Sequence, residues 1–190
     1  MNQKLKRLMI IAMMLSLAII VNYMETFIPV FVPGVRLGLA NVIILIMLYE
    51  FNFYETFIVD LLRIFIVSLI RGTFLAPVFF MSLSGGMLSL FGMFILSKTK
   101  IFSAIGVSSF GAILHTLGQI LALIIIVSNY NVINYVPIIG LLSVLTGILS
   151  GLIAHVYLIR SITYNYVLVN TKYKEKYAKP KEIIDENETQ

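Results

Sequence analysis

The 190-residue chain is 59% hydrophobic and 12% charged, with a formal net charge of +5 and no cysteine. Soluble domains average roughly 45–50% apolar and about 25% charged residues, so the composition predicts a protein embedded in a lipid bilayer. Without cysteine, disulfides, thiolate metal sites and cysteine nucleophiles are excluded, and with two histidines we expect no metal site and no cofactor. The basic residues concentrate at the chain ends and in one loop, which favours membrane topology over nucleic-acid binding.

The apolar region Leu37–Ile70 is ambiguous, because as a single helix it would be about 51 Å long and would exceed the ~30 Å bilayer core. A polar cluster, Tyr49–Glu55, interrupts it. We therefore divide the region into two spans, Leu37–Tyr49 and Glu55–Arg71. The remaining predicted spans are Leu8–Tyr23, Pro77–Ser97, Ile101–Val127 and Val136–Ile159. No cleavage pattern of small residues follows the first span, so we expect it to be retained.

The positive-inside rule supports this division. With a cytoplasmic N-terminus, six spans place Lys98, Lys100 and the basic C-terminal region on the cytoplasmic side, whereas an undivided Leu37–Ile70 would place them outside. We predict an all-α protein of the cell membrane with six transmembrane helices and both termini cytoplasmic. Residues 1–165 form the transmembrane domain and residues 166–190 a charged tail. The Trp-free composition, rich in Ile, Lys, Asn and Tyr, suggests a bacterial source.

Small residues recur at four-residue spacing in several spans, a pattern that lets helix backbones approach closely. They would mediate packing within the protein or docking to a partner membrane subunit. The positions are Ala12 and Ser16; Ser82, Gly85, Gly86, Ser89 and Gly92; Ala104, Ser108 and Ala112; and Ser143, Gly147 and Gly151.

Several polar residues fall at middle or outer depth within the predicted spans, where ionisable groups are functional candidates. They are Asn41, Arg63, Ser82, Ser84, His115 and Gln119. We expect these residues to converge on a ligand-binding cavity that opens outward. Glu25 and Arg36 would lie at its rim, and Pro33–Gly34 would be the hinge of a lid. A solvated charge is the simpler interpretation of Glu25, Arg36 and Arg71, and also of Glu50 and Glu55 at the inner turn.

Each candidate also has a structural interpretation. Asp60 and Arg63 are three residues apart, so they share a helix face and would form an ion pair, unless Arg63 keeps donors for an anionic ligand. His115 and Gln119, four apart, would make an interhelical hydrogen bond, a ligand contact or a proton-sensitive site. Asn41 fits a helix–helix hydrogen bond and a ligand contact equally well.

Motifs for enzymatic chemistry are missing. The sequence contains no P-loop, no HExxH and no GxSxG stretch. It also lacks the paired aspartate-rich motifs with which a soluble prenyl diphosphate synthase holds magnesium; the close acidic pair Asp185–Glu186 lies in the polar tail. We therefore expect this chain not to be an enzyme.

Five segments together resemble the Gx transporter family, which is also labelled heptaprenyl diphosphate synthase component I. They are Pro33–Asn41, Leu61–Arg63, Gly72–Phe74, Ser82–Ser89 and Gly111–Gln119. The resemblance covers roughly Leu8–Ile159 and extends to the substrate-binding S components of energy-coupling factor (ECF) transporters. It implies an S-component-like bundle of six helices whose ligand site is capped by the loop after the first helix.

The resemblance also implies partners. S components dock to a transmembrane coupling subunit through small residues on the first helix. Ala12 and Ser16 match that spacing, although Ser16 stands where the motif has alanine. The leading hypothesis is an ECF substrate-binding subunit for a small vitamin-like or isoprenoid/quinone-related molecule, with ATPases on other chains. The alternatives are an accessory subunit of polyprenyl (heptaprenyl) diphosphate or menaquinone synthesis, and a component of flavin-based extracellular electron transfer or quinone export.

Overall fold

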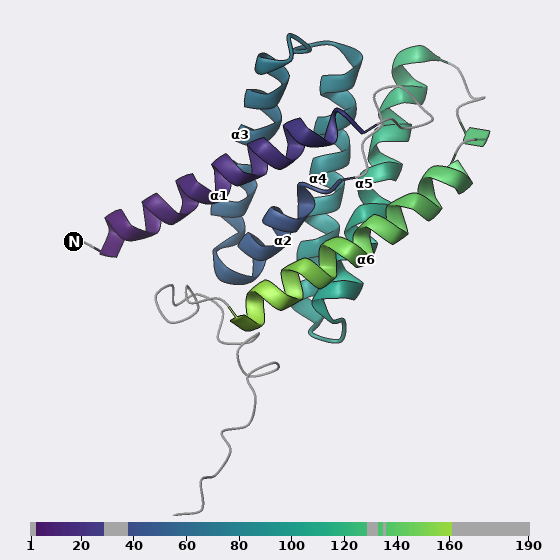
Figure 1. Cartoon of the computed structure of the whole chain (residues 1–190). Coiled ribbons are helices and arrows are strands. Elements are labelled where there is room, and N and C mark those ends of the chain that lie inside the picture. Colours follow the sequence, from purple (N-terminus) through teal and green to yellow (C-terminus); the bar gives the residue numbers. More distant parts are fainter. Residues whose placement is uncertain (1–2, 29–37, 129–132, 135, 161–190) are drawn as a thin grey trace, which may run out of the picture.

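The computed structural model describes residues 3–28, 38–128, 133–134 and 136–160, and within these ranges the chain is helical and contains no strand (Figure 1). The helices are α1 Gln3–Glu25, α2 Asn41–Glu50, α3 Phe53–Ile70, α4 Pro77–Thr99, α5 Ala104–Val127 and α6 Val136–Arg160. Arg36, the Pro33–Gly34 break and the tail 166–190 lie outside the described residues. The predicted lid and the predicted domain boundary therefore stay predictions.

Four of the described helices, α1, α4, α5 and α6, are long and apolar enough to cross a membrane. Helix α3 has 18 residues but carries Glu55, Asp60 and Arg63. Helix α2 has 10 residues, and at ~1.5 Å per residue it is about half as long as the ~30 Å bilayer core is thick. The all-helical class is confirmed, and the expectation that α2 is a span like the others is not.

Helix α2 occupies the centre of the bundle. It contacts all five other helices, and nine of its ten residues are buried. Its sequence is apolar around its whole circumference apart from Asn41 at one end and Tyr49 and Glu50 at the other, as expected for a helix surrounded by protein. Helices α1 and α6 cross the other helices on the outside of the bundle (Figure 1).

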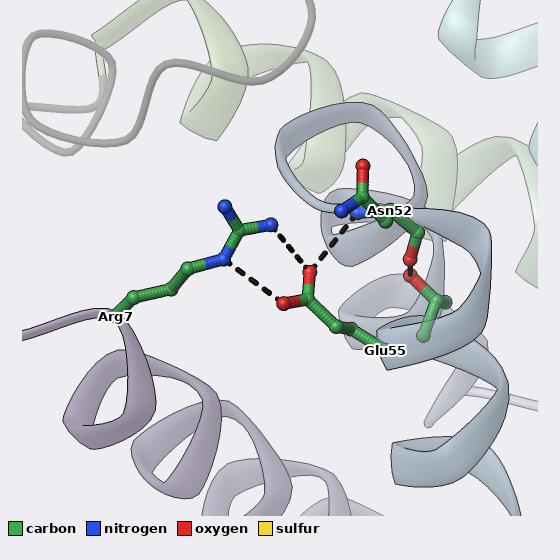
Figure 2. Close-up of polar contacts among 4 residues, drawn as sticks. Arg7, Asn52 and Glu55 are labelled. Carbon is green, nitrogen blue, oxygen red and sulfur yellow. Dashed lines mark hydrogen bonds and ion pairs between the residues drawn. The ribbon is translucent and has the colours of Figure 1, made fainter. Parts of the chain in front are cut away.

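The division between α2 and α3 is where the polar cluster predicted it, at Phe51–Asn52. Glu55 accepts the Asn52 backbone N–H at 3.2 Å and so supplies an acidic partner at the start of α3. The same carboxylate forms a two-bonded ion pair with Arg7 of α1, at 2.9 and 2.6 Å (Figure 2). Glu55 is therefore partly buried, and Glu50 is 6% exposed. The expectation that both are solvated is wrong, because Arg7 of α1 pairs with Glu55, and Glu50 belongs to the buried helix α2.

The small residues of α4, α5 and α6 pack against one another, which confirms packing within the protein at these positions. A Cβ built on Gly118 of α5 would lie 2.8 Å from Gly85 Cα of α4. A Cβ built on Gly151 of α6 would lie 2.6 Å from Ile105 Cα of α5. Real Cβ atoms do not approach backbone that closely, so the spacing between these helices depends on glycine at both positions.

Candidate ligand-binding site

A small cavity lies among the C-terminal end of α1, the middle parts of α3 and α5, and the second turn of α4. Its empty volume is about 240 Å³, which includes space open to the outside. Only about 10 Å³ of that space admits the centre of a water-sized molecule, so the cavity holds about one water or one hydroxyl-sized group in the described conformation. Its lining residues are Asn22, Glu25, Gly38, Arg63, Ile64, Ser82 and His115.

Arg63 is the centre of a buried polar network behind this cavity. Its Nε donates to Asp60 Oδ1 at 2.6 Å, and its Nη2 donates to Asn41 Oδ1 at 2.9 Å. Asn41 Nδ2 in turn donates to Ser89 Oγ at 3.1 Å, which ties α2 and α3 to α4. Arg63 is 2% exposed and Asp60 is fully buried. The predicted ion pair is thus present, and it neutralises two charges that would be costly to bury separately.

Glu25, expected as a solvated rim charge, is 4% exposed. Its carboxylate accepts the backbone N–H groups of Gly38 and, at 3.3 Å, of Leu39. These groups precede α2, whose N-cap residue Ala40 makes no side-chain cap bond. A carboxylate near a helix N-terminus is stabilising. The N-terminus of α2 has no acidic residue of its own, and Glu25 of α1, 13 residues before Gly38 in the sequence, supplies one. This bonding accounts for the burial of Glu25.

His115 and Gln119 of α5 are both buried, and their side chains hydrogen-bond to each other within the helix. The α4–α5 contact positions this pair. A Cβ on Gly85 would lie 2.7 Å from the His115 carbonyl oxygen and 2.8 Å from Gln119 Cγ. Ser84 Oγ of α4 donates to the carbonyl of Gly118, the residue before Gln119, at 2.9 Å. Ser84 therefore joins α4 to α5, and Ser82 of the same helix lines the cavity instead.

The predicted site residues thus fall into three groups. Glu25, Arg63 and His115 line the cavity. Asn41 and Gln119 do not line it but bond to the lining residues Arg63 and His115, and Ser84 bonds to α5. Arg36 lies outside the described residues. The sequence interpretation missed three lining residues, Asn22, Gly38 and Ile64. Asn22 carried a usable signal, because it lies three residues before Glu25 and so shares its helix face. Gly38 and Ile64 carried none, since only tertiary contacts bring them to the cavity.

Substitution of Gly38 by alanine is expected to close part of the cavity and to destabilise the protein by about 1–3 kcal/mol. Gly38 has φ +83°, and a Cβ there would lie 3.1 Å from Asn41 Nδ2 and 3.4 Å from His115 Cδ2. Gly72→Ala is the matched control, because Gly72 has φ +63° and no atom within 4 Å of the added Cβ. In thermal unfolding in detergent, the melting temperature should fall further for Gly38→Ala than for Gly72→Ala. Equal losses would mean that backbone strain alone is responsible.

A protein-family model described as heptaprenyl diphosphate synthase component I matches residues 14–157. The match includes every residue that lines the cavity. Comparisons with curated proteins and with solved structures found no match.

Proposed function

The chain belongs to the heptaprenyl diphosphate synthase component I family, and we propose that it is a substrate-binding membrane subunit that holds a small molecule in the Arg63 cavity. One observation carries the proposal: the C-terminal end of α1 and helices α3, α4 and α5 bring polar side chains to one small cavity. Burying a guanidinium, a carboxylate, an amide and an imidazole in a bundle of mostly apolar helices is costly, and such residues usually serve a ligand or transport pathway.

Arg63 is the central ligand-binding residue in this proposal. The bonds that the described residues make to it use Nε and Nη2, so the Nη1 group remains for an oxygen acceptor on a ligand. His115 and Glu25 would contact the same ligand, while Asn41, Gln119 and Ser84 hold the walls in place. Arg36 would act at the rim, as the sequence suggests. A vitamin-like or isoprenoid/quinone-related molecule is the ligand class that we propose.

We further propose that the subunit works in an ECF-type transporter. Ala12 and Ser16 are exposed on α1, and Ser16 Oγ donates to the Ala12 carbonyl, which leaves a low-polarity helix face for a transmembrane coupling subunit. ATPases on other chains would supply the energy. The distribution of basic residues supports cytoplasmic termini in a bacterial cytoplasmic membrane, with six chain passages of which α2 belongs to the second and α3 to the third.

The family description favours a second candidate. As a component of a synthase, the chain would assist a soluble catalytic partner in heptaprenyl diphosphate or menaquinone synthesis. Catalysis would reside in that partner, because this sequence lacks paired aspartate-rich motifs. A role in flavin-based extracellular electron transfer is a variant of the same idea, in which the membrane subunit handles a quinone-related compound.

Ligand extraction and mass spectrometry test the proposed site. Purified wild-type protein should retain a small molecule that the Asp60→Asn/Arg63→Gln double variant has lost, because the guanidinium is gone while no buried charge is left unpaired. Arg71→Gln, which removes a half-buried cation outside the cavity, is the control and should retain the molecule. Equal retention by all three proteins contradicts the site.

Co-purification separates the two functions. Recovery of a membrane coupling subunit with ATPases, dependent on Ala12 and Ser16, supports the transporter subunit. Recovery of a soluble prenyl diphosphate synthase instead supports the accessory role.

A further inference from the structure

Three of the polar side chains that line the cavity have a fixed hydrogen-bonding character. Arg63 has N–H donors and no acceptor, and its bonds to described residues use Nε and Nη2. Ser82 Oγ donates its own hydrogen to the Val78 carbonyl at 2.8 Å, so it presents lone pairs to the cavity. The Glu25 carboxylate accepts two backbone N–H groups and is an acceptor as well. A group that bonds to Arg63 and to either acceptor must both accept and donate.

Neither charged residue in the lining favours an anion in this space. The charge of Arg63 is neutralised by Asp60, whose Oδ1 accepts the Nε hydrogen at 2.6 Å. Glu25 is buried and lines the same space. An anion there would lie beside the Glu25 carboxylate in a buried setting, where like charges repel strongly because little water screens them. Arg63 therefore offers hydrogen bonds to a ligand rather than a net attraction for negative charge.

The free space limits the size of the group that enters. The cavity has room for about one water or one hydroxyl-sized group. A hydroxyl brings a single oxygen atom, whereas a carboxylate and a phosphate bring several oxygens and an excess of lone pairs. A carbonyl oxygen is small enough, but it accepts without donating. A hydroxyl therefore matches the cavity in size and in hydrogen bonding, and it can replace a water molecule bond for bond.

We propose that the cavity recognises one uncharged hydroxyl group of its ligand, which accepts a hydrogen bond from Arg63 and donates one to Glu25 or Ser82. This inference rests on the proposed function and narrows its ligand class to alcohols and phenols. The carbonyl form of the same compound is rejected because it has no hydrogen to donate. The carboxylate and phosphate forms are rejected because they are too large and face the Glu25 carboxylate. Selectivity thus comes from mismatches with the wrong group as much as from bonds to the right one.

Four probes that share one carbon skeleton test this selectivity. Geraniol carries a hydroxyl, and geranial, geranic acid and geranyl phosphate carry an aldehyde, a carboxylate and a phosphate instead. Binding of each tritiated probe to the immobilised full chain in detergent is measured by scintillation proximity at about pH 8, where a carboxylate is ionised. The signal from the Asp60→Asn/Arg63→Gln double variant is subtracted, because it reports probe dissolved in the micelles. Circular dichroism and elution as a single species establish that each variant is folded.

We expect geraniol to bind the wild-type protein at least about tenfold more tightly than each other probe, which is the effect of one hydrogen bond to a charged group. Glu25→Gln keeps a side-chain oxygen for the two backbone N–H groups but removes the negative charge and adds N–H donors. The preference for geraniol over geranic acid should therefore shrink in this variant by about tenfold. Glu55→Gln is the matched control, because it removes a carboxylate that pairs with Arg7 outside the cavity, and it should keep the wild-type preference.

Three results overturn the inference: an anionic probe or the aldehyde that binds as tightly as geraniol, a Glu25→Gln protein with an unchanged preference, or no binding above the level of the double variant. The extraction experiment distinguishes this failure from failure of the proposed function. If the double variant loses the molecule that the wild type retains while geraniol is not preferred, the proposed function stands and the hydroxyl assignment falls. If the double variant keeps that molecule, the proposed function itself falls.

Discussion

Replacing Arg63 alone by glutamine is expected to destabilise the protein by about 3–5 kcal/mol. Asp60, fully buried, would then be a carboxylate without a counter-charge, and its Oδ2 already has no hydrogen-bond partner among the described residues. Asp60→Asn alone should cost a similar amount, because it leaves the guanidinium buried without an anion. The free energy of unfolding, measured by SDS titration in mixed micelles, provides the test.

The double variant Asp60→Asn/Arg63→Gln should recover most of that loss, because no net charge remains and the two amides can still bond to each other and to Asn41. The coupling energy from the double-mutant cycle would then be several kcal/mol. Losses that simply add would show that the two residues do not act as a pair. Arg71→Gln serves as the control for removal of a cation and should change stability by little.

The second large effect is expected at the α4–α5 contact. Gly118→Ala should destabilise the protein by about 1–3 kcal/mol, because its added Cβ would lie 2.8 Å from both Gly85 Cα and the Ser84 carbonyl oxygen. These are backbone atoms, so relief requires the helices to separate. Separation would lengthen the 2.9 Å bond from Ser84 Oγ to the Gly118 carbonyl and displace His115. Ligand retention should therefore fall together with the melting temperature.

Gly140→Ala is the matched control for that experiment. Gly140 lies in α6, and an added Cβ there meets no atom within 4 Å. Because alanine favours helix by about 1 kcal/mol over glycine, this substitution should be neutral or stabilising. A Gly118→Ala protein as stable as the Gly140→Ala protein would contradict the close approach of α4 and α5.

Some residues of the candidate site could be predicted from the sequence and others could not, for a physical reason. Arg63 and His115 could be found because a polar residue within an apolar span is costly and requires an explanation. Glu25 was expected only at the rim, because it follows the predicted first span. The pairing of Asp60 with Arg63 could also be predicted, since residues three apart on a helix share a face. The roles of Asn41, Ser84 and Gln119 behind the cavity could not, because distance from a cavity depends on how helices rotate against each other.

The sequence by itself determined that the protein is all-helical with membrane-spanning helices, where the helical elements lie, and where the break between α2 and α3 falls. Hydrophobic length, Pro and Gly signals and the polar cluster at Tyr49–Glu55 act locally, so each can be interpreted without the rest of the chain. Only the tertiary structure decided that α2, with 10 residues, is a central buried helix. It also decided that Glu25 bonds to the backbone before α2. Both depend on contacts between distant segments, and helix packing, rather than periodicity, selects those contacts.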